Sequence, residues 1–310
     1  YTTGEGVVLL EPQSTNLLPY SEDFSYVKWL KEDNSTLGLN TYLSPSGENN
    51  ASELNLPNTL SRITYVFAST GVHTFSIYLR SDTDGTISIR SATGSPAVEQ
   101  QVSLTSQWQR FDISVTDGNY WQVIKKASDT LTSVYIWGAQ IEALPYATSY
   151  IPTSGAIATR LADSVTGAGD ATTFNSTEGV LFLEMATLVN GGSNRYISLG
   201  SGTHRISILF RTLTGRIQID GTSFSNIEAT GIPQDNNNKI AVSYSSSGVK
   251  LFVNGVLEDS NTDNPNFPTN SLSSLDFDLN GTLPFYGKVK ALAVFNEALT
   301  DSELECLTTI

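Results

Sequence analysis

Residues 73–81 read HTFSIYLRS, a stretch in which apolar and polar side chains alternate one by one. Phe75, Ile77 and Leu79 fall on one side of this stretch, and the polar residues fall on the other together with Tyr78. Alternation with a period of two is typical of a β-strand that buries one face. The same pattern recurs at residues 86–92, 109–115, 120–126 and 134–142. The first half of the chain is therefore predicted to be built from strands.

The second half shows the same pattern without repeating the sequence. Its apolar runs recur about every 8–12 residues with Gly, Asn and Ser between them, as in a sandwich or jelly roll. Near the end, Thr300 and Glu303 fit a capping box, followed by Leu304 and Leu307 on one face of a short helix that should pack as a lid on a sheet edge. The candidate strands are 180–188, 194–200, 204–211, 215–221, 239–246, 249–258, 274–279 and 288–296.

The stretch WGAQIEALPYATSYIPTSG (137–155) lies at the midpoint of the chain and changes character along its length. It begins like a buried strand and then runs into Pro145, Pro152 and a Ser/Thr/Gly spacer, which is the composition of a linker. Enough strands for a complete sandwich lie on each side of it. The chain is thus predicted to be all-β, with two tandem β-sandwich (jelly-roll) domains at residues 1–152 and 153–310 and a short C-terminal helix.

The chain is acidic throughout, with a formal net charge of −14. Residues 1–152 hold 8 Lys/Arg against 15 Asp/Glu and the remainder 9 against 16, so each half carries −7. Such a surface repels phosphate backbones and acidic membranes, and no apolar run approaches the roughly 18 residues of a membrane span. We expect no nucleic-acid partner and no membrane insertion. The single Cys306 excludes an intrachain disulfide, and its helical position favours a packed, unreactive thiol.

Catalytic patterns are missing from the sequence. A retaining glucanase needs two carboxylates about 5 Å apart, which on one strand takes the pattern ExDxE. Glu184 stands alone, and Asp276 and Asp278 form a pair without a third member, as on a solvated strand face. No GxSxG, HExxH, paired CxxC or GxxxxGK(S/T) motif occurs, and two histidines with one cysteine disfavour a transition-metal centre. We expect no enzymatic site.

Outward-facing aromatic rings offer a different chemistry. A ring presents a flat apolar face to the C–H side of a sugar, while Arg, Asn and Gln bind its hydroxyls. Tyr78 and Arg80 share the outward face of their strand, Arg90 is expected to point the same way on the next strand, and Trp121 follows a turn that favours a ring near the surface. These four are the predicted carbohydrate-binding residues. A purely structural pairing of the arginines with rings on neighbouring strands is the alternative.

Several segments of the first half, taken in order, resemble a module found in phage tail and tail-fibre proteins. They are EPQSTNLLPYSEDF (11–24), Trp29, TFSIYLRS (74–81), WQRF (108–111), and WGAQIE (137–142) followed by YATSYIPTSG (146–155). That module is similar to the jelly-roll carbohydrate-binding modules of bacterial cellulases and xylanases. The resemblance implies a jelly roll over most of residues 7–155, with Trp108, Tyr135 and Trp137 in packing roles.

The second half resembles the concanavalin A-like lectin/glucanase superfamily in its laminin-G-like form. One supporting segment is KIAVSYSSSGVKLFVNGV (239–256), whose Asn254-Gly255 suits a tight hairpin turn. The other is YGKVKALAVFNEALTDSEL (286–304), which ends in the family's usual capping helix. This resemblance implies a second sandwich.

The jelly-roll resemblance also implies a structural Ca²⁺ where the loop of the first strand meets the last strand. Glu22 and Asp23 stand at the first place and Glu142 at the second. Carboxylate oxygens are ligands that Ca²⁺ prefers, although no loop has EF-hand spacing. Solvated turns are the alternative interpretation of the acidic loops. No other cofactor is expected.

Together the two resemblances imply non-catalytic binding of a polysaccharide or cell-surface glycan, as the C-terminal receptor-binding part of a phage tail or fibre protein. Such proteins commonly form homotrimers, in which multivalency strengthens weak single-site binding. The location would be extracellular or on the virion surface. Two alternatives stay open: a carbohydrate-binding appendage of a secreted glycosidase or lyase, and a structural or protein-interaction module.

Overall fold

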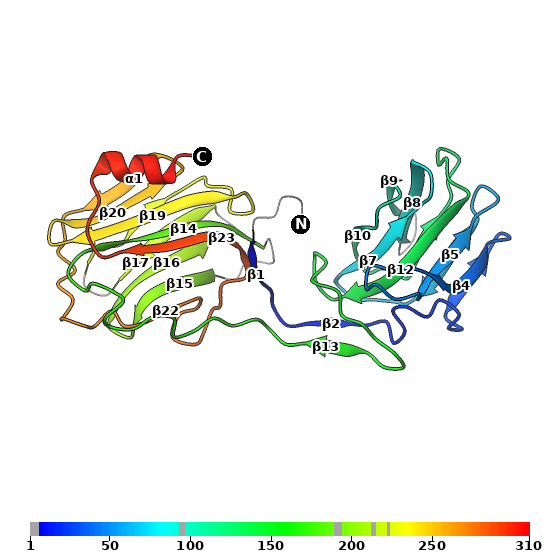
Figure 1. Cartoon of the computed structure of the whole chain (residues 1–310), viewed down its shortest axis with the longest axis horizontal. Helices are drawn as coiled ribbons and strands as arrows, with labels where there is room; N and C mark the ends of the chain where they lie inside the picture. The colour runs from blue at the N-terminus through cyan, green and yellow to red at the C-terminus, as the bar shows by residue number, and fades with distance from the viewer. Residues whose placement is uncertain (1–5, 93–96, 189–193, 212–214, 222–223) are drawn as a thin grey trace. The chain divides into compact units, whose positions relative to one another are not determined.

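The computed structural model describes residues 6–92, 97–188, 194–211, 215–221 and 224–310. Over these residues the structure is nearly all β, with one short helix (Figure 1). The chain divides into a first sandwich, residues 13–161, and a second sandwich, residues 1–12 and 162–310. The predicted all-β class is confirmed. The boundaries differ from the predicted domains 1–152 and 153–310 at both ends of the first sandwich.

The difference at the N-terminus has a physical cause in strand pairing. Strand β1 (Val8–Leu10) pairs antiparallel with β23 (Gly287–Phe295), and Leu10 is buried in the core of the second sandwich. The chain then builds the whole first sandwich before it returns. At that point β2 (Ser14–Asn16) and β13 (Ala158–Arg160) pair as a two-stranded ribbon, which ties together the entry and the exit of the first sandwich.

The first sandwich contains two five-stranded antiparallel sheets. Sheet I consists, in spatial order, of β3 (Trp29–Glu32), β6 (Arg62–Val66), β11 (Tyr120–Ile124), β8 (Gly85–Ala92) and β9 (Val98–Leu104). Sheet II consists of β10 (Gln109–Thr116), β7 (Val72–Arg80), β12 (Ser133–Glu142), β5 (Ala51–Asn55) and β4 (Thr36–Tyr42). Strands β7 and β8 follow one another in sequence but belong to different sheets, so the chain crosses the sandwich between them.

The inner faces of both sheets form one apolar core. Phe75, Ile77 and Leu79 of β7 lie in it, as their alternation predicts. From sheet I, Trp121 contributes a ring whose centroid lies 6.1 Å from that of Phe75. Trp29 packs its ring 4.9 Å from that of Tyr65 in the same core. Aromatic rings at these separations contribute beyond the area that they bury.

Strand β12 changes the face that it buries at Gly138. The register with β7 shifts between Trp137 and Gln140, so that the inward residues are even-numbered before the bulge and odd-numbered after it. Gly138 has a φ of +60°, and a Cβ there would lie 3.1 Å from the Tyr78 ring. Glycine suits both the backbone angle and the close approach. The residues of β12 that enter the core between the sheets are Val134, Ile136, Ala139 and Ile141.

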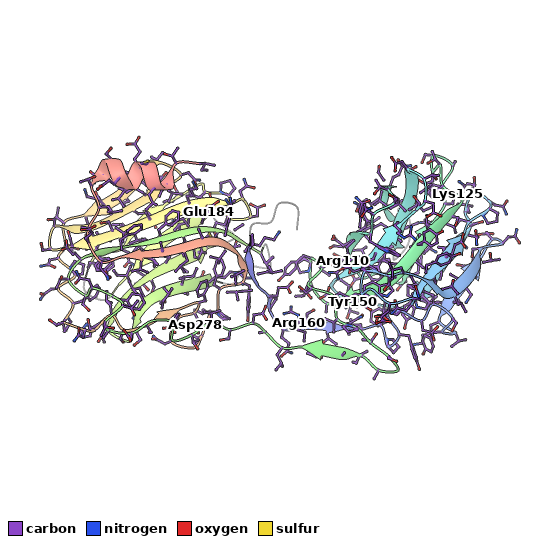
Figure 2. All side chains as sticks on the ribbon, viewed as in Figure 1. Arg110, Lys125, Tyr150, Arg160, Glu184 and Asp278 are labelled. Atoms are coloured by element: carbon purple, nitrogen blue, oxygen red, sulfur yellow. The ribbon has the colours of Figure 1, made fainter. Side chains whose placement is uncertain are left out.

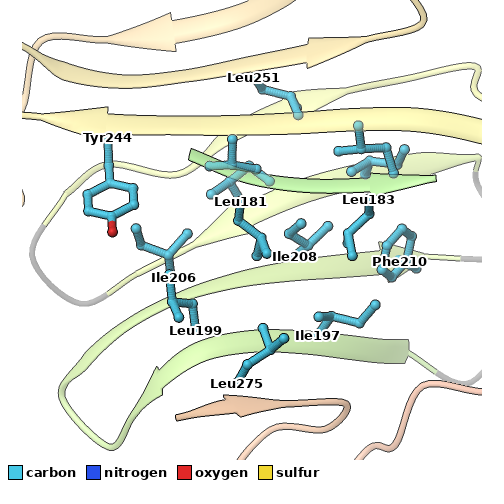
Figure 3. Packing of buried hydrophobic residues seen from close by; sticks show 14 of the residues in the cluster. Leu181, Leu183, Ile197, Leu199, Ile206, Ile208, Phe210, Tyr244, Leu251 and Leu275 are labelled. Atoms are coloured by element: carbon cyan, nitrogen blue, oxygen red, sulfur yellow. The ribbon is translucent and has the colours of Figure 1, made fainter. Parts of the chain in front are cut away.

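The second sandwich also has two antiparallel sheets. Sheet III consists of β1, β23, β14 (Gly179–Thr187), β19 (Asn238–Ser245), β20 (Gly248–Val253) and β21 (Val256–Asn261). Sheet IV consists of β18 (Ile227–Ala229), β17 (Arg216–Asp220), β16 (His204–Arg211), β15 (Asn194–Ser201) and β22 (Leu275–Asp276). Figure 3 shows side chains of β14 and β20 from sheet III facing those of β15, β16 and β22 from sheet IV.

Two local features of the second sandwich follow their sequence signals. Asn254 and Gly255 connect β20 to β21 with φ angles of 52° and 84°, as the two-residue hairpin requires. Helix α1 (Asp301–Thr308) begins with the predicted capping box, in which Thr300 and Glu303 bond each other's backbone. It packs on the outer face of sheet III across β19 and β20 (Figure 1). Leu304 is its buried anchor.

The predicted environment of Cys306 is wrong. Leu304 and Thr308 form the buried face of α1, and Cys306, two residues from each, is exposed. A thiol on this side of the helix contacts water because the apolar stripe of so short a helix is narrow. No helix among the described residues has the length and apolar character needed to cross a membrane.

Removing the side chain of Leu10 should destabilise the second sandwich and leave the first unaffected. Leu10 is 5% exposed and joins the core beside β23, so Leu10→Ala should lower the free energy of unfolding by about 2–5 kcal/mol. Hydrogen exchange of the whole chain, measured by mass spectrometry, should speed up in peptides of β14 and β23. Val8→Ala is the matched control because Val8 is 56% exposed. Faster exchange in β7 and β12 would contradict the assignment.

Candidate functional site

A row of five side chains crosses the outer face of sheet I. Leu30, Thr64, Gln122, Arg90 and Glu99 stand directly opposite one another on successive strands from β3 to β9. They face outward because the inward positions of the same strands are taken by buried residues, such as Trp29, Ile63, Trp121, Ile89 and Val102. Cross-strand neighbours of this kind lie close enough to interact.

An open groove of about 510 Å³ lies over this row. Its rim is apolar, with Leu30, Leu60 and Val66 each between 43% and 51% exposed. Tyr120, half-buried at the start of β11, adds an aromatic ring to the lining. The floor is polar and includes Thr64, which bonds to groups on both sides of it. The groove thus combines apolar edges with a hydrogen-bonding floor.

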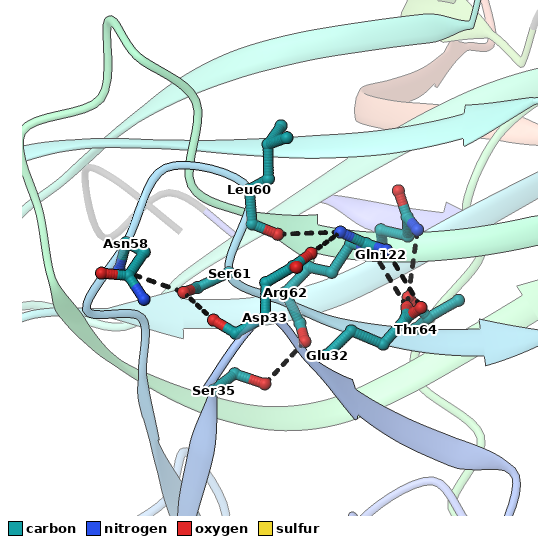
Figure 4. Close-up of polar contacts among 9 residues, drawn as sticks. All are labelled: Glu32, Asp33, Ser35, Asn58, Leu60, Ser61, Arg62, Thr64 and Gln122. Carbon is teal, nitrogen blue, oxygen red and sulfur yellow. Dashed lines mark hydrogen bonds and ion pairs between the residues drawn. The ribbon is translucent and has the colours of Figure 1, made fainter.

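A chain of hydrogen bonds fixes the polar floor (Figure 4). Arg62 donates from two nitrogens to the two carboxylate oxygens of Glu32, each at 3.0 Å, and it also contacts Asp33. The Thr64 hydroxyl donates to Glu32 Oε2 at 2.5 Å. Gln122 Nε2 in turn donates to Thr64 Oγ1 at 3.0 Å. A bidentate arginine–carboxylate pair is geometrically rigid, so it anchors the whole chain of bonds.

Gln122 and Arg90 each have a polar atom that takes no part in these hydrogen bonds. Gln122 is 6% exposed, and its Oε1 is buried with no hydrogen-bond partner among the described residues. The buried Nε of Arg90 likewise has none, its nearest carboxylate oxygen being Glu99 Oε2 at 3.8 Å. The Arg90 guanidinium lies 5.7 Å from the centre of the Tyr120 ring. Because native proteins rarely leave buried polar atoms unpaired, these two atoms beside the groove are groups that a ligand or an ordered water has to satisfy.

Charges in and beside the groove balance. Each cation stands close to at least one carboxylate, with Lys126 2.9 Å from the same Glu99 oxygen that Arg90 approaches. No large excess of one sign therefore attracts a charged ligand from a distance. The cations are Arg62, Arg90 and Lys126, and the anions are Glu32, Asp33 and Glu99.

The four predicted sugar-binding residues do not form one site. Arg90 lies in the groove on sheet I, whereas Tyr78 and Arg80 lie on sheet II, because β7 and β8 belong to different sheets. The expectation that Arg90 points the same way as Arg80 is therefore wrong. Trp121 is a second correction: its side chain is 0% exposed in the core, where its indole Nε1 donates to the Phe67 carbonyl at 3.2 Å.

Tyr78 and Arg80 belong to a packed layer on the outer face of sheet II. The Arg80 guanidinium lies 4.0 Å from the Tyr135 ring centre and 5.4 Å from that of Trp108. The Tyr78 ring meets the edge of Trp137 at 5.3 Å between centres. The centre of the Tyr78 ring also lies 6.2 Å from that of Tyr150 and 5.5 Å from the Arg110 guanidinium carbon, two residues that are labelled in Figure 2. The structure supports the cross-strand alternative here, and their role in sugar binding stays a prediction.

The residue that sequence reasoning missed is Gln122. In YWQVI, burial of Val123 in the core places Trp121 on the same inward face, and Tyr120 and Gln122 outward. The alternation was therefore sufficient to choose Tyr120 in place of Trp121. The role of Thr64 and Arg62 had no comparable signal, because it depends on β6 and β11 being neighbours in sheet I.

The three carboxylates predicted to hold Ca²⁺ have separate partners. Glu142 is fully buried and accepts from the Ser14 hydroxyl at 2.6 Å and the Thr148 backbone at 3.0 Å. Asp23 accepts from Ser25 in its own turn. Glu22 accepts from Asn50 and Tyr150. Among the residues that the structure describes, no three acidic, histidine or cysteine side chains are grouped to hold a metal, so a common Glu22–Asp23–Glu142 site is not formed.

The acidic residues considered for catalysis lie in the second sandwich and have structural partners (Figure 2). Glu184 accepts a hydrogen bond from Asn237 at 2.7 Å and pairs with Lys290 at 3.3 Å. Burial alone would raise the pKa of Glu184, but these contacts outweigh it and lower the pKa. Asp278 is buried, where a solvated face was expected, and it accepts from the backbone of Gly281 at 2.8 Å.

Comparison with known proteins places residues 171–305 in a match to the laminin-G-type family of the concanavalin A-like lectin/glucanases superfamily. This match covers most of the second sandwich and does not include the first. Among curated proteins, no match is found.

Solved structures of low similarity include domain 4 of an extracellular arabinanase from Geobacillus stearothermophilus in complex with arabinotriose, with 20% identity over 54% of this chain and 81% of that one, at a TM-score of 0.37. Domains LG4-5 of the mouse laminin alpha1 chain share 11% identity over 80% of this chain and 91% of theirs, at a TM-score of 0.30. A leech intramolecular trans-sialidase shares 19% identity over 44% of this chain, at a TM-score of 0.36. The match spans only 24% of the leech chain.

Replacing Trp121 should unfold the first sandwich more readily, whereas replacing its neighbour should not. Trp121→Ala removes a fully buried ring and should cost about 3–5 kcal/mol of unfolding free energy. Tyr120→Ala removes a half-exposed ring and should change stability by about 0.5 kcal/mol or less. Urea denaturation of both variants checks this. Equal stability of the two variants would be inconsistent with Trp121 in the core.

Alkaline pH should weaken the packed layer through Tyr135. Burial and the hydrogen bond to Asp82 raise the pKa of Tyr135 to about 12. An unfolded tyrosine ionises near pH 10, so the stabilisation is complete below about pH 10 and is lost as the pH rises to about 12. Wild type should lose more stability between pH 9 and pH 11 than Tyr135→Phe, in which the other tyrosines are unchanged. Parallel losses in urea denaturation would refute this.

Proposed function

We propose that the first sandwich binds a neutral saccharide in the groove over sheet I and does not cleave it. The observation that carries the proposal is the groove itself, where a half-exposed Tyr120 ring stands beside an Arg90 guanidinium that donates no hydrogen bond to any described residue. A sugar requires both an apolar surface for its C–H face and polar groups for its hydroxyls. The groove supplies both kinds of contact.

The apolar part of the groove fits the ring faces of a saccharide. Leu30 and Val66 expose side chains at the rim, and Tyr120 lies between them and Arg90 in the lining. Four of the five strands of sheet I, from β3 to β8, lie under the groove, and neighbouring strands are about 4.8 Å apart. A ligand lying across the strands therefore meets a surface about 15 Å wide, enough for a short run of sugar units.

The charges favour a neutral ligand. Three cations and three carboxylates stand in or beside the groove, so a uronate or sulfate finds no excess of positive charge there. The chain as a whole carries a formal charge of −14, which repels polyanions at long range. Hydroxyl recognition by short-range hydrogen bonds is unaffected by that charge.

The setting that we propose is host recognition by a phage tail or fibre protein, at the virion surface. The sequence segments between residues 11 and 155 that resemble, in the same order, a module of such proteins support this setting. In this setting the chain is expected to form a homotrimer, so that several weak grooves act together. The competing setting is a carbohydrate-binding appendage of a secreted polysaccharide-degrading enzyme. Light scattering distinguishes the two, because the appendage is expected to be a monomer.

Variants in the groove should lose glycan binding while the fold is kept. Arg90→Ala and Tyr120→Ala should each weaken binding of the intact chain to a neutral polysaccharide by about tenfold or more, a change of about 1.4 kcal/mol. Affinity electrophoresis against soluble neutral glucans, xylans and mannans, followed by calorimetry, measures this. Reducing ends should not increase during incubation.

Arg216→Ala is the matched control for the arginine variant. Arg216 is a partly exposed arginine on β17 of the second sandwich, paired with Glu228 at 3.2 Å. This variant should bind as wild type does. If it abolishes binding while both groove variants bind normally, the site lies in the second sandwich and the proposed groove is wrong.

A further inference from the structure

We infer that Gln122 and Arg90 together read one free hydroxyl group of the ligand, so that the groove selects unsubstituted saccharides over O-alkylated ones. This inference rests on the proposed function and names the chemical group that the groove recognises. It depends on two buried atoms that have no partner in the part of the chain that the structure describes, Gln122 Oε1 and Arg90 Nε, on residues at directly opposed positions of β11 and β8.

The orientation of the Gln122 amide is fixed by its neighbours. A threonine hydroxyl has one proton, and that of Thr64 is donated to Glu32 Oε2 at 2.5 Å. Glu32 is a carboxylate held by Arg62 and has no proton to give back. Thr64 Oγ1 can therefore only accept from Gln122, so the NH₂ group of Gln122 must face Thr64 at 3.0 Å. The amide oxygen must then face away from Thr64, as drawn in Figure 4.

The two unpaired atoms have opposite requirements. Gln122 Oε1 accepts a hydrogen bond and Arg90 Nε–H donates one. A hydroxyl group satisfies both because it can donate its proton to one atom and accept from the other. A peptide N–H or a carbonyl oxygen satisfies only one of them, and an ether oxygen satisfies only Arg90. The pair is therefore complementary to a saccharide hydroxyl more than to a peptide or to a methylated sugar.

A ligand reaches the pair only if a side chain moves. Neither atom is accessible to solvent in the unbound protein. Arg90 is the residue with freedom to move, because its side chain is 27% exposed and its only ion pair within the described part of the chain is the 3.8 Å contact with Glu99. Gln122, in contrast, is hydrogen-bonded to Thr64 and only 6% exposed. The side chain of Arg90 therefore moves on binding, whereas Gln122 Oε1 is the fixed acceptor.

Thr64 is a positioning residue in this arrangement, since it acts through Gln122. Replacing it with valine keeps the shape of the side chain but removes both the bond to Glu32 and the acceptor for Gln122. The amide of Gln122 is then free to turn and to present NH₂ to the ligand. Thr64→Val should therefore change the selectivity of the groove, and not only its affinity.

The test uses hexasaccharides of β-1,4-linked glucose, xylose and mannose, each beside its per-O-methylated form, with the intact chain. Wild type should bind at least one free hexasaccharide about tenfold or more tighter than its methylated form. In Gln122→Met, which keeps the size but has no acceptor, this ratio should fall to about two. In Thr64→Val the ratio should also fall, because the methylated form gains. Thr116→Val, at an exposed position on β10, should keep the wild-type ratio.

A second readout needs no ligand. In the free wild-type protein, the side-chain amide protons of Gln122 should show nuclear Overhauser effects to protons of Thr64. In Thr64→Val these effects should be lost, while the backbone chemical shifts stay those of wild type. Binding of a hexasaccharide with the same ratio in all variants would overturn this inference and leave the groove intact. Failure of every hexasaccharide to bind would overturn the proposed function together with the inference.

Discussion

The strict two-residue period of β11 is the constraint on which the site depends. Burial of Trp121 and Val123 between the sheets turns Tyr120 and Gln122 outward, since consecutive side chains of a strand point to opposite faces. The indole is held by a bond to the Phe67 carbonyl as well as by packing. A slip of one residue would place a glutamine amide in the core and an indole in the groove. The apolar core thus sets the chemistry of the surface on its other side.

Alternation was enough to predict strands, their buried residues and the overall class, because each of these depends on residues two apart. Phe75, Ile77 and Leu79 are buried as expected. Which strands share a sheet depends on pairing between distant segments, and the sequence carries little local signal for it. The misplacement of Arg90 relative to Arg80 and the membership of β1 in the second sandwich both have this origin.

The two outer faces of the first sandwich differ in how their side chains are covered. On sheet II, Tyr135 donates to Asp82, Arg80 pairs with the same carboxylate and lies between two rings, and Glu53 accepts from Tyr42 and Ser133. That face behaves as a second, shallow packing layer. On sheet I the chain of bonds ends at Gln122 with an acceptor left over. Buried polar atoms without a partner among the described residues occur on sheet II as well, at Arg110 and Trp137, so the case for a ligand at Gln122 depends on the groove that lies over it.

In an acidic protein that binds a neutral sugar, the net charge acts at long range, whereas hydrogen bonds in the groove act at short range. The charge of −14 acts over a distance limited to about 8 Å at physiological salt, and it disfavours polyanions before contact. Within the groove, each cation has a carboxylate close by, so binding depends on hydrogen bonds whose geometry is set by Arg62 and Glu32. An ion pair of this kind adds little stability at a surface. Its value here is that it orients Thr64, and through Thr64 a single oxygen atom of Gln122.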